Sequence, residues 1–203
     1  MNLGIDEAGR GCIIGPMIVA GVFIEQEKLR TLKSIGVKDS KKLTKRSRES
    51  LYRLIFEIVN GVTIVKVEPE LIDKYNLNLL TKYSMLKIIE TSPYRLSKVV
   101  IDKVGNMQDV EETVIRTGAI PIIENKADDK YLEVGAASIV AKVIRDDIIA
   151  SLKEKYGDFG SGYPSDKKTI NWLHAVLTKG PPPIVRRSWK TLQKLSSNYY
   201  MTK

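Results

Sequence analysis

Apolar and polar positions along the chain predict strands first, and then strands that alternate with helices. Short apolar runs at residues 3–5 and 17–24 predict two strands around a glycine-rich turn, and the β-branched run 63–67 predicts a third. Between these runs we expect a helix with Thr44 as its N-cap and Gly61 beyond its end. Its apolar face is formed by Leu51, Leu54, Ile55, Ile58 and Val59.

The second half of the chain continues with helices between short strands. Residues 99–102 and 120–123 read as strands, and residues 158–168 as a glycine-rich loop. Helices are expected at residues 69–73, 77–90, 110–116, about 131–155, 170–177 and 189–195. This order predicts a single α/β domain over residues 1–203, a mixed sheet with helices on both faces. Its core ends near residue 180, and residues 181–203 form a helical C-terminal segment and tail.

Charge and composition narrow the classes of partner and of site. The net charge of +9 and the pI near 9.5 favour a polyanionic partner such as nucleic acid. Cys12 is the one cysteine and His174 the one histidine, so an internal disulfide and a multi-histidine metal site are excluded. No apolar run reaches the ~20 residues of a membrane span, and no basic region opens the chain, so we expect a cytoplasmic protein.

Acidic residues stand at the ends of several predicted strands. Asp6 and Glu7 follow the first strand, Asp102 ends the run VVID, and Asp128 lies in ENKADDKY after another strand. Neighbouring side chains in a strand face opposite ways, so Asp6 and Glu7 share a site only where the strand ends. Without histidine or cysteine sets, such acids offer hard oxygen ligands, which suit Mg²⁺ or Mn²⁺. Two alternatives stay open: a solvated strand end, and helix capping by Asp128 and Asp129.

A glycine-rich turn follows the first two acids directly, in the stretch GIDEAGRG. Gly9 and Gly11 leave their backbone N–H groups open to a ligand, and Arg10 adds a guanidinium suited to a phosphate or sugar oxygen. The alternative is an ordinary tight turn that needs glycine for its backbone angles. We call residues 9–11 the Gly-Arg-Gly turn.

Seven stretches, taken together, carry a resemblance to a known family. They are GIDEAGRG with Gly15-Pro16, VKDSKKL, VVID, ENKADDKY, AASIVAKVIRD, GSGYPSD and PPIVRRSW, and they span nearly the whole chain. In this order they resemble type 2 ribonuclease H, ribonuclease HII, in its archaeal form. The resemblance implies a ribonuclease H-like fold, with a mixed five-stranded sheet flanked by helices and a helical C-terminal segment. It also implies a metal-dependent endonuclease that degrades the RNA strand of RNA–DNA hybrids and nicks on the 5′ side of ribonucleotides embedded in duplex DNA. Two-metal-ion hydrolysis would leave 3′-hydroxyl and 5′-phosphate ends.

The same resemblance assigns roles to individual residues. Asp6, Glu7, Asp102 and Asp128 would be the catalytic, metal-binding acids. Gly9, Arg10 and Gly11 would contact the ribose 2′-hydroxyl, and Tyr163 would stack on the next deoxyribose. The basic positions expected to hold phosphates are Lys41, Lys42, Lys142, Arg145, Arg186 and Arg187, with a solvated surface as the alternative for the lysines. Cys12 departs from the family, where proline is common; a small buried residue is expected there, with a reactive thiol as the alternative.

The tail resembles a motif that binds sliding clamps. The stretch QKLSSNYY begins with Gln193 and ends with Tyr199 and Tyr200, although Ser196 stands where an aliphatic residue is usual. A frayed terminus with two exposed tyrosines is the alternative. We otherwise expect a monomer.

Two other classes of function remain to be weighed against a nuclease. A nucleotide-hydrolysing or phosphotransfer domain could also use a glycine-rich turn, but the chain has no GK[ST] stretch of the Walker type. A hybrid-binding module without catalysis would leave the acids structural, although gathering carboxylates without metal costs stability. Metal dependence and nucleotide turnover distinguish the three.

Overall fold

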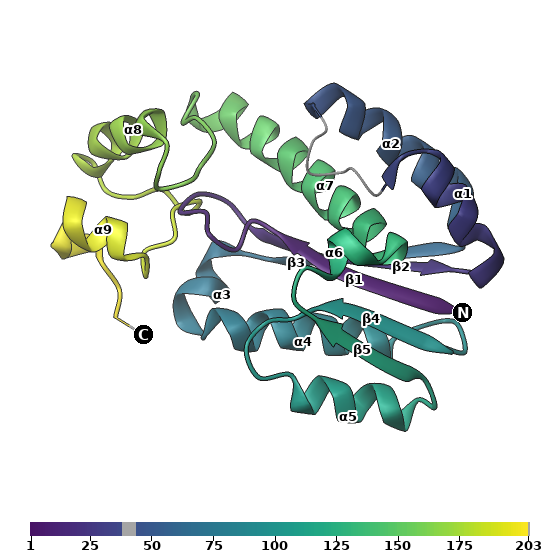
Figure 1. Ribbon diagram of the computed structural model, residues 1–203. Helices are drawn as coiled ribbons and strands as arrows, with labels where there is room; N and C mark the ends of the chain where they lie inside the picture. The colour runs from purple at the N-terminus through teal and green to yellow at the C-terminus, as the bar shows by residue number, and fades with distance from the viewer. Residues whose placement is uncertain (38–43, 203) are drawn as a thin grey trace. The chain divides into compact units, whose positions relative to one another are not determined.

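The computed structural model describes residues 1–37 and 44–202. Within these residues, five strands form one sheet in the order β3-β2-β1-β4-β5 (Figure 1). The strand β1 pairs antiparallel with β2 and parallel with β4, and β4 pairs parallel with β5. The predicted mixed five-stranded sheet is therefore confirmed. The strands are β1 (Asn2–Ala8), β2 (Met17–Ile24), β3 (Gly61–Val67), β4 (Lys98–Asp102) and β5 (Ile120–Glu124).

The helices agree with most of the predicted ones. They are α1 (Leu29–Ser34), α2 (Lys45–Ile58), α3 (Pro69–Lys74), α4 (Leu77–Glu90), α5 (Gln108–Arg116), α6 (Ala127–Lys130), α7 (Leu132–Tyr156), α8 (Lys167–Leu177) and α9 (Lys190–Leu195). Short 3-10 helices cover Gln26–Lys28 and Ser197–Tyr199. Thr44 is confirmed as a cap, since its side chain accepts from the N–H of Ser47 at 3.2 Å. Leu54 was wrongly placed on the buried face of α2, because it is 39% exposed.

The chain divides into two compact units. The first contains Met1–Ala8, Ile18–Val65 and Thr81–Val143, and the second contains Gly9–Met17, Lys66–Leu80 and Ile144–Lys203. The acids at the ends of β1 and β4 belong to the first unit, and the Gly-Arg-Gly turn belongs to the second. That residues 1–203 act as a single domain stays a prediction.

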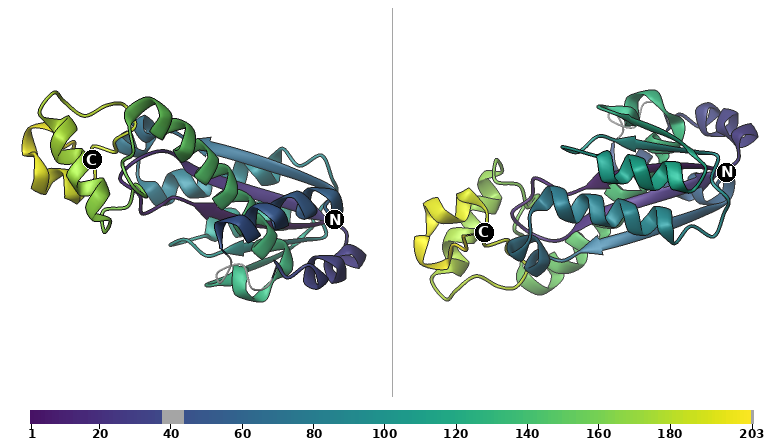
Figure 2. Two further views of the ribbon diagram at one scale, coloured as in Figure 1. Left: turned by 90° about the horizontal axis from the view of Figure 1, so that it is seen from above. Right: turned by 90° about the horizontal axis from the view of Figure 1, so that it is seen from below.

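Two glycines show how helices pack on both faces of the sheet in the first unit. A Cβ added to Gly4 of β1 would lie 2.3 Å from the backbone carbon of Glu133 in α7. A Cβ added to Gly21 of β2 would lie 2.5 Å from the Ile88 side chain in α4. Only glycine allows so close an approach, so α7 and α4 lie directly on opposite faces. Figure 2 shows the same arrangement, with α2 and the first half of α7 over one face and α4 and α5 over the other.

The second unit has a hydrophobic core of its own. Ile13 and Ile14, from the segment after the Gly-Arg-Gly turn, pack there with side chains from the end of α7, from α8 and α9, and from the loops between them. The other buried members are Ile149, Phe159, Leu173, Leu177, Ile184, Val185 and Leu192. Because the turn leads straight into this core, its backbone is fixed by apolar packing on one side.

Candidate active site

Asp6, Glu7 and Asp102 lie at one end of two neighbouring parallel strands, and we call them the acid cluster. Pairing of β1 with β4 runs to Ile5 opposite Ile101, so Asp6 and Asp102 occupy the next step along each strand. The carboxyl ends of parallel strands meet at the same edge of a sheet, which brings the acids of β1 and β4 together.

The structure corrects the predicted extent of the first strand. Residues 3–5 were expected to form it, with the acids beyond its end, but β1 continues through Asp6 and Glu7 to Ala8. On the β2 side these residues stay paired, with Asp6 opposite Ala20. On the β4 side the pairing has already stopped. Asp6 and Glu7 therefore lie where β1 is still paired with β2 but extends beyond its pairing with β4.

Asp6 is the most deeply buried acid of the cluster, with 6% of its surface exposed. Burial raises the pKa of its carboxyl well above the usual value, and the negative charges of Glu7 and then Asp102 raise it further. Hydrogen bonds from the Ser138 side chain and from the Glu7 backbone N–H, the latter at 2.8 Å, act in the opposite direction. The cluster thus concentrates negative charge that a bound cation would relieve.

Ser138 is a site residue that the sequence analysis missed. It lies in α7, within a run of small residues on the helix that packs against β1. Its side chain hydrogen-bonds the Asp6 carboxyl, as noted above. A serine among alanines on the helix face that covers the sheet was the available signal, because a partly buried hydroxyl there favours a polar partner.

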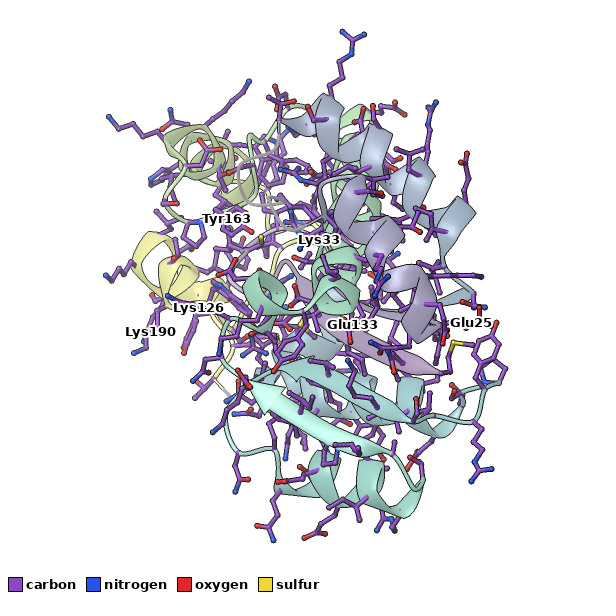
Figure 3. All side chains as sticks on the ribbon, turned by 45° about the vertical axis from the view of Figure 1, so that its right-hand side comes forward. Glu25, Lys33, Lys126, Glu133, Tyr163 and Lys190 are labelled. Atoms are coloured by element: carbon purple, nitrogen blue, oxygen red, sulfur yellow. The ribbon has the colours of Figure 1, made fainter. Side chains whose placement is uncertain are left out.

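Asp102 connects the cluster to the short helix that carries Asp128. Its Oδ1 atom accepts a hydrogen bond from the backbone N–H of Ala127 at 2.9 Å. Asp128 follows in the first turn of α6, whose N-cap is Lys126 in a left-handed conformation (φ 57°). Figure 3 labels Lys126 at this point and Glu133 at the start of α7. The fourth predicted acid is thereby anchored through the backbone to the third.

Glu124 ends β5 directly opposite Asp102 in the register, and the sequence analysis did not single it out. Its carboxylate pairs with the ammonium of Lys130 and accepts from the Tyr131 hydroxyl at 2.9 Å. These partners lower the pKa of Glu124. Glu124 is therefore already neutralised by its own neighbours, in contrast to Asp6.

The donor set fits a hard divalent cation in its chemistry. All four predicted acids offer carboxylate oxygens, and the repulsion around Asp6 is what a cation would offset. As the side chains lie, no three acidic, histidine or cysteine side chains within residues 1–37 and 44–202 are gathered around one point for an ion. The structure thus brings Asp6, Glu7 and Asp102 together electrostatically and links the start of α6, which carries Asp128, to Asp102 by one hydrogen bond. That Asp128 shares a metal site with them stays a prediction.

The Gly-Arg-Gly turn is closely packed on its inner side. Gly9 has a φ of +88°, and a Cβ there would lie 2.4 Å from Nε of Arg145 and 2.9 Å from the carbonyl oxygen of Pro16. A Cβ on Gly11 would lie 3.8 Å from Cε1 of Tyr163. The turn predicted to read the ribose and the tyrosine predicted to stack on the next sugar are therefore neighbours.

Tyr163 presents part of its ring to solvent, with 37% of its surface exposed (Figure 3). Its hydroxyl hydrogen-bonds the side chain of Cys12. Burial first, and then Cys12, raise the pKa of Tyr163 to about 12. Cys12 itself is fully buried, as the sequence predicted. The tyrosine is held at its hydroxyl end and stays a neutral phenol at physiological pH.

Two of the predicted phosphate-binding arginines lie in the interior of the second unit. Arg186 is fully buried, and it donates from Nε to the carbonyl of Gly15 and from Nη1 to the carbonyl of Arg10, both at 2.9 Å. Burial lowers the pKa of Arg186 to about 10. Arg145 is 3% exposed. Their contact with phosphates stays a prediction, but in this structure both support the Gly-Arg-Gly turn and the chain after it.

The remaining predicted residues differ in their surroundings. The guanidinium of Arg10 donates to Asn78 Oδ1 at 2.6 Å, and that of Arg187 donates to the carbonyl of Tyr199 at 2.9 Å. Lys142 is half-buried on α7. Lys41 and Lys42 lie outside the described residues.

The tail packs on the second unit. Tyr199 lies against its hydrophobic core, and the N–H of Met201 donates to the carbonyl of Arg187 at 3.0 Å. Gln193 is exposed on α9, and Tyr200 is half-buried. The alternative of a frayed terminus is therefore wrong for the segment as far as Met201. Among the described residues, no helix combines the length and apolar character needed to cross a membrane.

Comparison with known proteins shows the family of the chain. The sequence model of the ribonuclease HII family matches residues 3–192. The ribonuclease HII of Sulfurisphaera tokodaii is 57% identical, covering 99% of this chain and 98% of its own. That of Sulfolobus acidocaldarius is 53% identical, covering 99% and 97%.

Solved structures show the same likeness. The ribonuclease H2 of Pyrococcus horikoshii superposes with a TM-score of 0.90 at 38% identity, covering 98% of both chains. An Archaeoglobus fulgidus ribonuclease HII, solved as a complex with PCNA, gives 0.85 at 40% identity over 97% of both. The chain thus belongs to the ribonuclease HII family, metal-dependent hydrolases that degrade the RNA of RNA–DNA hybrids.

Proposed function

We propose that this chain, beyond degrading the RNA strand of hybrids, nicks duplex DNA on the 5′ side of a single embedded ribonucleotide. The proximity of Gly11 to the Tyr163 ring, whose Cε1 would lie 3.8 Å from a Cβ added at Gly11, carries the proposal. An enzyme that recognises one ribonucleotide must distinguish a ribose from the deoxyribose beside it, which needs two adjacent recognition elements. Removal of ribonucleotides left in DNA during replication and repair is the task that such cleavage would serve.

The four acids Asp6, Glu7, Asp102 and Asp128 are proposed to hold two Mg²⁺ or Mn²⁺ ions. When bound, such a pair lowers the pKa of the attacking water and stabilises the leaving oxyanion, which gives 3′-hydroxyl and 5′-phosphate ends. The relief of repulsion around Asp6 supports this assignment. Ser138 fixes the Asp6 carboxyl by its hydrogen bond, and the Asp102 contact with Ala127 fixes the start of α6.

The Gly-Arg-Gly turn is proposed to read the ribose 2′-hydroxyl through its backbone. Glycine at positions 9 and 11 keeps this backbone free of side chains, and Gly9 is irreplaceable sterically because Arg145 packs against it. The half-exposed Tyr163 ring offers a flat apolar face to the next sugar, where an extra hydroxyl would be poorly accommodated.

Cleavage of a DNA duplex that contains one ribonucleotide tests the proposal. We expect a nick on the 5′ side of that ribonucleotide with Mg²⁺ or Mn²⁺, and none with EDTA. The end groups should be a 3′-hydroxyl, which a polymerase extends, and a 5′-phosphate, which a ligase accepts. Metal-dependent cleavage of long hybrids alone would refute the single-ribonucleotide activity and leave the acid site intact.

The role of Tyr163 has its own test. We expect Tyr163→Ala to lower kcat/KM on the single-ribonucleotide duplex by about tenfold or more, from the loss of one stacking contact. Cleavage of a long hybrid should change far less. Tyr83→Ala is the matched control, since Tyr83 is 69% exposed on α4. Equal losses on both substrates would exclude the stacking role.

A sliding clamp is the proposed protein partner. The PCNA complex of the Archaeoglobus fulgidus relative and the QKLSSNYY stretch support it. Tyr199 packs on the core of the second unit, so clamp binding would compete with that packing. Deletion of residues 197–203 should abolish binding to an archaeal clamp in a pull-down, and absence of binding by the intact chain would end the proposal.

A further inference from the structure

The side chain of Arg145 packs against the Gly-Arg-Gly turn. It lies in the second half of α7, and its Nε would be only 2.4 Å from a Cβ on Gly9. Its Nη2 atom also lies 3.4 Å from the carbonyl oxygen of Ile14, in the segment that follows the turn. One side chain therefore touches the chain on both sides of the segment 10–13.

The same guanidinium also contacts the tyrosine. Its central carbon is 5.6 Å from the centroid of the Tyr163 ring, within the range of a cation–π interaction. A Cβ on Gly162, the residue before Tyr163, would lie 3.7 Å from Nη2 of Arg145. The loop that carries the tyrosine and the turn are thus packed on one charged group.

Burial separates Arg145 from bulk solvent, with 3% of its surface exposed. A buried charge is costly unless it is paired or hydrogen-bonded, so a merely structural role could be filled more cheaply by an apolar residue. Arg186, the other buried arginine, bonds the carbonyls of Arg10 and Gly15 and stacks on Trp189 at 4.9 Å. Arg145 differs from it by contacting the turn and the Tyr163 ring together.

We propose that Arg145 is a positioning residue that fixes the Gly-Arg-Gly turn and the Tyr163 ring at one separation, without itself touching nucleic acid. It thereby sets the preference for a single embedded ribonucleotide over a long RNA strand. This inference rests on the proposed function, because it assumes that the turn and Tyr163 form the recognition site. It replaces the sequence-based expectation that Arg145 holds a phosphate.

Two variants of Arg145 and one control test the proposal. Arg145→Met keeps an unbranched stem as far as the position of Nε and removes the rest of the guanidinium group with its charge. Arg145→Lys keeps the charge without the planar group. Lys190→Met removes one exposed positive charge from the same unit and serves as the control. Circular dichroism establishes that each variant is folded, and Arg145→Lys carries the test if the methionine variant is not.

The first readout is kcat/KM on two substrates. We expect Arg145→Met to lose about tenfold to thirtyfold on the single-ribonucleotide duplex, as for a desolvated cation–π contact, and less than threefold on a long hybrid. Arg145→Lys should recover part of the loss. Equal losses on both substrates would overturn the proposal.

The second readout distinguishes positioning from phosphate binding. The salt dependence of hybrid binding should have the same slope in Arg145→Met as in the wild type. A slope smaller by about 0.9 would show that Arg145 neutralises one phosphate, and would overturn the proposal.

The third readout does not depend on activity. Cys12 is the one cysteine of the chain, is fully buried, and hydrogen-bonds Tyr163. If Arg145 holds this cluster closed, Cys12 should react with a thiol reagent about tenfold faster in Arg145→Met, and as slowly as wild type in Lys190→Met. An unchanged rate would contradict the proposal.

These outcomes separate the inference from the function on which it rests. If the wild type does not nick at a single ribonucleotide, the proposed function itself fails. If the wild type nicks and Tyr163→Ala loses that activity selectively, while Arg145→Met affects both substrates alike, only the role of Arg145 fails.

Discussion

The acid cluster and the Gly-Arg-Gly turn are separated by one residue in the chain, yet they meet opposite electrostatic demands. At the acid cluster, carboxylates repel one another around a buried Asp6, whose pKa is raised as a result. Around the turn, the buried Arg145 and Arg186 donate to backbone carbonyls. The first region gathers negative charge that a cation would offset, whereas the second holds buried positive charge against backbone carbonyls, with Nε of Arg145 and Nη2 of Arg186 left without a hydrogen bond among the described residues. We infer that the acid cluster performs the cleavage chemistry and that the packing around the Gly-Arg-Gly turn fixes the shape of a recognition surface.

The largest expected effect comes from removing one acid of the cluster. Asp6→Asn or Asp102→Asn should lower cleavage of every substrate by about a thousandfold, since a metal contributes several kcal/mol of transition-state stabilisation. Hybrid binding, measured by fluorescence anisotropy, should stay largely intact. Asp129→Asn is the matched control, because it makes the same change at an exposed position of α6. An equal loss of cleavage in Asp129→Asn would show that the effect of Asp6→Asn and Asp102→Asn is not specific to the acid cluster.

The two neighbouring aspartates of α6 test whether Asp128 belongs to the metal site. Asp128→Asn and Asp129→Asn differ by one position in α6, and we expect only the first to reduce cleavage and Mn²⁺ affinity, the latter followed by calorimetry. Similar behaviour of the two variants would remove Asp128 from the proposed metal site.

An added methyl group probes how tightly each region is packed. Gly4→Ala would drive a Cβ into the backbone of Glu133, and Gly9→Ala would drive one into Arg145 at a φ of +88°. Each should lower the free energy of unfolding by about 1–3 kcal/mol, measured by urea denaturation. Gly118→Ala is the control, since its φ is +81° and nothing lies within 4 Å. If Gly118→Ala lowers the free energy of unfolding as much as Gly9→Ala does, backbone strain and not packing explains the effect of Gly9→Ala.

The smallest effect concerns the loop that carries Tyr163. Asp166 accepts from the N–H groups of Ser161 at 2.6 Å and Lys168 at 2.9 Å, and these bonds lower its pKa to about 2. A lowered pKa in the folded state contributes stability above the ordinary value near 3.8, and this stability is lost as the pH falls toward 2. Asp166→Asn should therefore flatten the decline of thermal stability between these pH values. Glu57→Gln, exposed on α2, should not change it.

Much of the acid region could be predicted from the sequence, and less of the recognition region. Acids at strand ends can be found in the sequence because a carboxylate side chain by itself indicates a candidate metal ligand. The burial of Arg145 and Arg186 was not visible, because arginine usually lies at the surface. Their partners are carbonyls such as those of Ile14 and Gly15, which any residue type supplies and no sequence pattern marks.

Two short helices were not predicted, and one strand was predicted too short, because contacts distant in the sequence stabilise them. The helix α1 and the short α6 are too brief to show a clear apolar period, so their formation depends on packing against the rest of the first unit. Strand β1 was predicted too short because its last residues are polar, whereas pairing with β2 extends it to Ala8.

Parallel kinetics of Asp102→Asn and Tyr163→Ala on two substrates test the division of labour most directly. The substrates are a duplex with one ribonucleotide and a long RNA–DNA hybrid, each with Mg²⁺ or Mn²⁺. We expect Asp102→Asn to lose cleavage of both, and Tyr163→Ala to lose mainly the first. Equal losses by Tyr163→Ala on both substrates, or cleavage retained by Asp102→Asn, would contradict the assignment of chemistry to one region and recognition to the other.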